Sequence, residues 1–75
     1  MDSVLLTSLR ESSRHFYEGL VTASKGEKKY VLPFTFSDMN GVLRLASVAG
    51  LSYQLREEIT ERTTDLVLES IVAAY

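Results

Sequence analysis

The sequence predicts a mainly α-helical fold with three helices, over about residues 3–23, 38–49 and 52–74, and one short strand or extended segment over about 29–36. Three observations support this. Apolar residues recur at helical spacing in the first and last thirds of the chain, residues that end or begin helices separate the segments, and the middle alternates with a period of two. A chain of 75 residues makes a single small domain, 1–75, with a small core, so we expect oligomerisation to complete the fold.

The first predicted helix depends on the spacing of its apolar residues. Leu5, Leu9, Phe16 and Leu20 fall on one side when successive residues are rotated by about 100°. Gly26 is a natural stop for this helix, because it reaches the left-handed conformation without a steric cost. A turn therefore follows, and a new element begins after it.

The middle segment has the alternation of a half-buried strand. Pro33 donates no backbone hydrogen bond, so the strand belongs at an edge or pairs on one side only. Its partner comes from a second copy, from another protein or from a short strand over 24–29; an extended linker whose aromatic residues fill the core is the alternative. Four side chains share one face of the segment: Tyr30, Leu32, Phe34 and Phe36.

The second and third helices are separated by a tight turn, in which Gly50 ends one helix and Ser52 caps the next. The last helix carries a narrow apolar stripe and, near its end, a second apolar side, which is typical of a helix that touches two neighbours. We expect the oligomer interface to combine this second side with the alternating face of the strand: Tyr30, Leu32, Phe34, Phe36, Val67, Leu68, Ile71 and Tyr75.

Residues 29–59 resemble the ribbon-helix-helix family of small dimeric regulators, through a strand, a helix, a Gly-Leu-Ser turn at Gly50 and a second helix. The resemblance implies a dimer in which two strands pair and their outward side chains read DNA bases. Here the outward positions are Val31, Pro33 and Thr35, and neither Val31 nor Pro33 can make the bidentate contacts that distinguish bases. The resemblance therefore supports dimerisation more than DNA recognition.

The same segment also resembles a helix-turn-helix, with Ala46 and Gly50 at the four-residue spacing of that motif. The resemblance implies that the helix after the turn meets DNA, but its carboxylates would repel phosphates. An ordinary helical hairpin explains the same residues without a ligand. The residues that we expect to contact a protein partner or nucleic acid are Lys25, Lys28, Lys29, Gln54, Arg56, Glu57 and Glu61.

The composition of the chain excludes several classes of function. The chain has a net charge of −2, which gives no general attraction to nucleic acid or anionic lipid. It has no Cys and one His, His15, so we expect no catalytic residues, no metal site and no cofactor. No segment is apolar over the roughly 18 residues that a membrane span needs, and the missing cysteines favour the cytoplasm.

These observations predict a non-enzymatic, homo-oligomeric regulator that acts by binding another protein, as an adaptor or an inhibitor. The alternative is a DNA-binding transcriptional regulator of ribbon-helix-helix or helix-turn-helix type. A third, weaker hypothesis is a small-ligand binder whose pocket between subunits is lined by Tyr17, Tyr30, Phe34 and Phe36.

Overall fold

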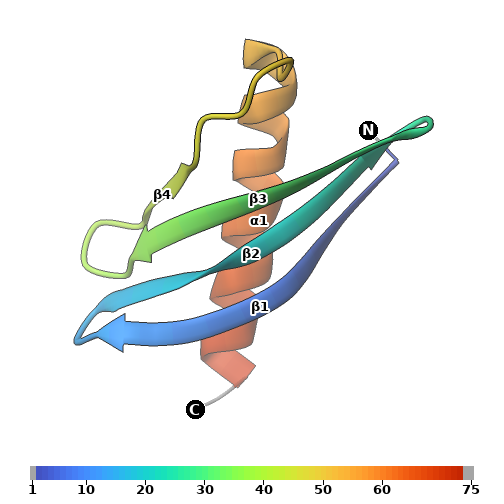
Figure 1. Cartoon of the computed structure of the whole chain (residues 1–75). Coiled ribbons are helices and arrows are strands. Elements are labelled where there is room, and N and C mark those ends of the chain that lie inside the picture. Colours follow the sequence, from blue (N-terminus) through green and yellow to red (C-terminus); the bar gives the residue numbers. More distant parts are fainter. Residues whose placement is uncertain (1, 74–75) are drawn as a thin grey trace.

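The chain folds into one antiparallel sheet with a single helix across one of its faces (Figure 1). This is a computed structural model, and it describes residues 2–73. The strands follow one another in the sheet in the order β1-β2-β3-β4, each antiparallel to its neighbours. Their bounds are Ser3–Ser13 for β1, Phe16–Lys25 for β2, Lys28–Ser37 for β3 and Val42–Leu45 for β4, and the helix α1 spans Tyr53–Ala73.

The mainly α-helical fold class is therefore wrong, and so are the helices expected over 3–23 and 38–49. The described part of the chain contains four strands and one helix. The helix expected over 52–74 corresponds to α1, and the segment expected over 29–36 corresponds to β3. The partner strands of β3 come from the same chain, since it pairs with β2 and β4.

Residues 3–23 form two strands because their side chains alternate between two faces, although a bulge conceals the alternation. Tyr17, Val21 and Ala23 in β2 are buried, and the residues between them are more exposed. In β1 the register shifts between Leu6 and Ser8, which moves the apolar side chains out of strict alternation. The hydroxyl of Thr7, the residue between them, donates a hydrogen bond to the Leu20 carbonyl of β2 at 3.0 Å.

The turns between strands use backbone conformations that favour short loops. Gly26 has φ of 60° in the two-residue turn between β2 and β3, as the first position of a type II′ turn requires. The turn between β1 and β2 places His15 at φ 68°, a conformation in which His is several-fold enriched over most side chains. His15 Nδ1 lies 2.9 Å from Asp38 Oδ1, so this turn contacts the loop after β3.

Residues 38–49 turn and form β4 in place of a helix. Gly41 has φ of 69° and closes the turn after β3, and Leu43 and Leu45 then point into the core while their neighbours are exposed. Ala46 donates its N–H to the Pro33 carbonyl at 2.9 Å, just beyond the last β3–β4 residue pair. The missing N–H of Pro33 thus lies where pairing with β4 ends.

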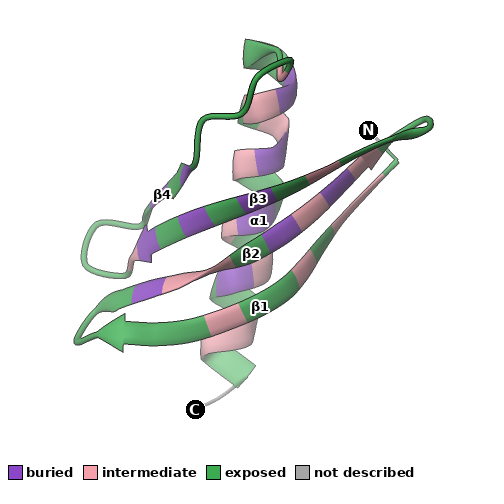
Figure 2. Cartoon of the chain, in the orientation of Figure 1, coloured by how far each residue is buried: buried purple, intermediate pink, exposed green. Residues whose placement is uncertain are grey.

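Ser52 caps α1 as the sequence predicts, but Gly50 follows β4 and an irregular segment and does not end a helix. Gly50 has φ of 83°, and the Ser52 hydroxyl accepts a hydrogen bond from the Leu55 N–H at 3.2 Å, as in an N-cap. One side of α1 then packs on the sheet through Leu55, Ile59 and further residues at helical spacing. The core between the two layers comprises Tyr17, Val21, Ala23, Leu32, Phe34, Phe36, Leu43, Leu45, Leu55, Ile59 and Val67 (Figure 2).

Candidate functional site

The face of the sheet opposite α1 is the most distinctive surface of the described chain. Strand side chains alternate between α1 and this second face, and no described helix or strand covers it (Figures 1 and 2). We call it the open face. It is formed by the outward side chains of all four strands: Leu5, Ser8, Arg10, Phe16, Glu18, Leu20, Thr22, Val31, Pro33, Thr35, Val42 and Arg44.

Apolar side chains form a band across the open face. Leu5 and Val31 are each 60% exposed and flank Thr22 in the paired register of β1, β2 and β3. In the next row of the sheet, Leu20 lies opposite Pro33, and both are exposed. Single exposed apolar residues are common, but several on one flat face are typical of a surface that contacts another molecule.

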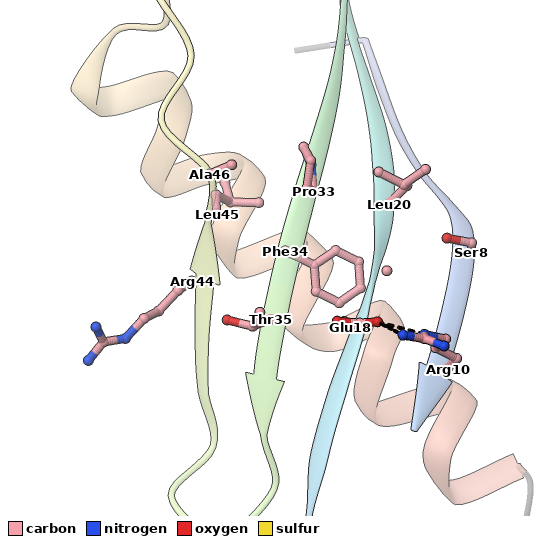
Figure 3. A pocket seen from close by; sticks show the side chains of 11 residues that line it. Ser8, Arg10, Glu18, Leu20, Pro33, Phe34, Thr35, Arg44, Leu45 and Ala46 are labelled. Carbon is pink, nitrogen blue, oxygen red and sulfur yellow. Dashed lines mark hydrogen bonds and ion pairs between the residues drawn. The ribbon is translucent and has the colours of Figure 1, made fainter. Parts of the chain in front are cut away.

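A shallow hollow of about 490 Å³ lies in the open face (Figure 3). Leu20, Pro33 and Ala46 supply its apolar part, and Thr35 lies beside them. Gly19 also lines it: a Cβ there would lie 2.9 Å from Phe34 Cζ and would collide with the Ser8 carbonyl. The absence of a side chain at Gly19 therefore lets β1 and the Phe34 ring approach β2 closely.

Charged groups border the hollow on both sides. Arg10 forms an ion pair with Glu18 across β1 and β2, with Nε 2.6 Å from Oε1. Arg44 extends from β4 away from the other lining side chains (Figure 3), and it makes no ion pair within residues 2–73. Two arginines against one glutamate leave an excess of positive charge on the strands around the hollow, although the chain as a whole is acidic. The surface can thus accept an apolar group next to a carboxylate or another anion.

The structure places the expected oligomer interface mostly inside a single chain. Within one copy, Leu32, Phe34, Phe36 and Val67 are buried, so in this fold a second copy cannot contact them. Tyr30 and Ile71 are half-buried against the same core, and Leu68 is exposed. Tyr75 lies outside the described residues.

The expected partner contacts are divided between two regions. Lys25, Lys28 and Lys29 are exposed at the hairpin between β2 and β3, where the Gly26 N–H also donates to Asp2 Oδ2 at 2.6 Å. The others, Gln54, Arg56, Glu57 and Glu61, lie on the first half of α1. The expected lysine contacts and the expected helix contacts therefore lie on different elements of the structure.

Arg56 has a structural contact that the sequence did not reveal. Its guanidinium donates hydrogen bonds to the carbonyl of Ala46, at 3.0 Å, and to that of Leu45. It thereby joins the first turn of α1 to the end of β4. Glu57, by contrast, is exposed, and its hydrogen bond with Tyr53 raises the pKa of that tyrosine above its usual range, with the glutamate charge adding to the effect.

Sequence reasoning missed the open face, because it assigned most of the residues that form it to helices. The chain matches no known protein family, no curated protein and no solved structure. Within residues 2–73, no cluster of three His, Asp or Glu side chains could hold a metal ion. The one described helix is not apolar enough over its length to cross a bilayer.

Proposed function

We propose that this protein is a non-enzymatic, homo-oligomeric regulator in the cytoplasm that acts by binding another protein through the open face. The observation that carries the proposal is the band of exposed apolar side chains on a sheet face that no described element covers. Leaving such a band in water is unfavourable by about 25 cal/mol per Å² of apolar surface, so a partner that covers it gains binding free energy.

The charges around the hollow support a partner with a particular chemistry. Arg44 lies on β4 at the border of the hollow that Pro33 and Leu20 line, and its guanidinium has no ion pair among the described residues. Guanidinium groups bind carboxylates through paired hydrogen bonds. A protein segment that combines apolar and acidic side chains therefore fits this surface.

Site-specific photo-crosslinking in the host cell tests the proposal. A photoreactive amino acid replaces Val31, which is 60% exposed on the open face, or Val72, which is 72% exposed on α1. We expect the probe at position 31, and not the probe at position 72, to capture one defined protein other than the chain itself. Purified partner should then bind at least tenfold more weakly to Val31→Lys than to Val72→Lys.

Two outcomes contradict the proposal. Capture of nucleic acid by the probe at position 31, or duplex DNA binding that weakens steeply with salt, indicates a nucleic-acid protein. Equal capture from positions 31 and 72 indicates that partners do not bind the open face in preference to the exposed side of α1.

A further inference from the structure

The sheet has one long edge without a partner. β1 is the outermost strand and has 11 residues, and within the described chain it pairs only with β2. Alternate N–H and C=O groups on its outer side therefore point away from the sheet. The opposite edge differs, because β4 has four residues and Arg56 binds carbonyl groups at its end.

The core is also incomplete along the same edge. Val4, Leu6 and Leu9 belong to β1 and pack against the core, but each is only half-buried. Ile71 of α1, a helix that packs on β1, is half-buried as well. Figure 2 shows buried residues along β2 and β3 and none along β1. We call these four side chains the β1 seam, and they remain partly exposed because none of the described strands or helices lies beyond β1.

We propose that a second copy of this chain covers this edge: the two β1 strands pair antiparallel about a two-fold axis and join both sheets into one. Such an arrangement is self-complementary, because the same strand and the same seam meet on both sides of the axis. It provides partners for the unpaired backbone groups and brings each β1 seam against the other. The inference deepens the proposed function, since it rests on a homo-oligomer and identifies its contact surface.

The composition of β1 permits this pairing. Natural edge strands avoid association through proline, lysine, shortness or bulges; β1 has 11 residues with no Pro and no Lys, although its register with β2 shifts after Leu6 and after Glu11. Its charged side chains are one arginine, Arg10, and one glutamate, Glu11, so two copies of the strand do not repel each other. An unrelated extended peptide could satisfy the backbone, whereas a second copy also brings the same apolar seam.

The available contact area is sufficient for a dimer. A strand of this length extends about 36 Å, and a sheet with one helix layer is about 15 Å thick. The contact then covers at most about 540 Å² on each copy, or about 1,100 Å² in total, which is close to the roughly 1,000 Å² expected of a biological interface. We expect the dimer to be detectable at high micromolar concentration.

Two neighbouring substitutions on β1 separate the proposed dimer contact from the open face. Leu6 belongs to the β1 seam, and Leu5 points to the open face. We expect sedimentation velocity to give a dimer for the wild-type chain and for Leu5→Lys. Leu6→Lys should shift the dissociation constant at least tenfold towards monomer, because it places a charge within the apolar seam that the second copy would cover.

A second measurement does not depend on how Leu6→Lys folds. The chain has no cysteine, so single cysteines at Ser8 or Ser12 report distances between copies without background. A disulfide requires Cα atoms within about 7 Å, and residues near the axis of an antiparallel pair meet this condition. We expect one β1 position to cross-link rapidly, and Val31→Cys on β3 to cross-link poorly.

The outcomes distinguish this inference from the proposed function. A wild-type chain that stays monomeric at high micromolar concentration overturns the inference, and so does a dimer in which no β1 position cross-links faster than Val31→Cys. A dimer lost in Leu5→Lys and retained in Leu6→Lys also overturns it. Partner capture at position 31 is measured separately, so it can succeed while the β1 contact fails, or fail while the β1 contact is confirmed.

Discussion

Replacement of Thr63 by Val should make the protein more stable. Thr63 lies on the side of α1 that faces the sheet, is 0% exposed, and its hydroxyl has no hydrogen-bond partner among the described residues. Other hydroxyls on α1 are satisfied: those of Thr60, Thr64 and Ser70 donate to the carbonyl four residues earlier, at 2.8, 2.7 and 2.9 Å. The unpaired hydroxyl is therefore specific to the one buried position.

The expected gain follows from the cost of burying a polar group. An unpaired buried hydroxyl costs about 1–3 kcal/mol in proteins, and Val has nearly the same shape and helix propensity as Thr. We expect Thr63→Val to raise the free energy of unfolding by about 1–2 kcal/mol. For a domain of this size, each 1 kcal/mol raises the melting temperature by about 4–8 °C.

Urea denaturation followed by circular dichroism measures this effect. Protein concentration is kept constant, because dimerisation would otherwise change the apparent stability. The midpoint should rise with an unchanged m-value. The control is Thr64→Val, which removes a satisfied hydroxyl at a half-buried position and should change stability by less than about 0.5 kcal/mol or reduce it. A neutral or destabilised Thr63→Val would mean that the hydroxyl has a partner, such as a buried water, and would refute the argument.

Two further predictions concern the first half of α1. Arg56→Ala should lower the free energy of unfolding by about 1–3 kcal/mol in urea denaturation, because two carbonyls at the end of β4 lose a charged donor. The control is Arg62→Ala, which removes only an exposed ion pair at 3.4 Å and should lower the free energy of unfolding by at most about 0.5 kcal/mol. An equal loss in both variants contradicts the role of Arg56. Tyr53 should ionise at higher pH than an unperturbed tyrosine, because the Glu57 carboxylate accepts its hydrogen bond and repels the phenolate. Glu57→Gln should lower that pKa in an NMR titration, and an unchanged value would show that Glu57 is not its cause.

The parts of the fold that the sequence predicts are those with local signals. The cap at Ser52 and the left-handed conformation of Gly50 depend only on neighbouring residues, and both occur, although Gly50 does not end a helix. The alternation of β3 is regular, because each apolar residue on one side meets the core. These features are decided within a few residues, so reasoning from the sequence can reach them.

The error over residues 3–23 has a specific physical origin. Leu5, Leu9, Phe16 and Leu20 fit a helical spacing, but Leu5, Phe16 and Leu20 lie exposed on the open face. Because the open face is partly apolar, each strand carries apolar residues on the side away from the core as well as on the core side. The bulge after Leu6 also shifts which residues of β1 face the core. Two superposed alternations then imitate the period of a helix.

The open face itself could not be predicted, because it depends on which strands pair and in what register. Leu20 and Pro33 become neighbours only through the β2–β3 pairing, and Arg10 meets Glu18 only through the β1–β2 pairing. The oligomer interface was assigned to Leu32, Phe34 and Phe36 because an isolated strand needs a partner. Once β2 and β4 supply that partner within the chain, those side chains belong to its own core.

The position of α1 after all four strands has a consequence during synthesis on the ribosome. Each strand pairs with its neighbour in sequence, so the sheet can assemble as the chain emerges. Its inner face, however, stays bare until the last of these elements, Tyr53–Ala73, has been made. A nascent chain stalled before that point presents two apolar faces and an unpaired edge at once, which is the condition in which chaperones bind and aggregation begins. Within the described chain, the inner face of the sheet can therefore be covered only after α1 has been synthesised.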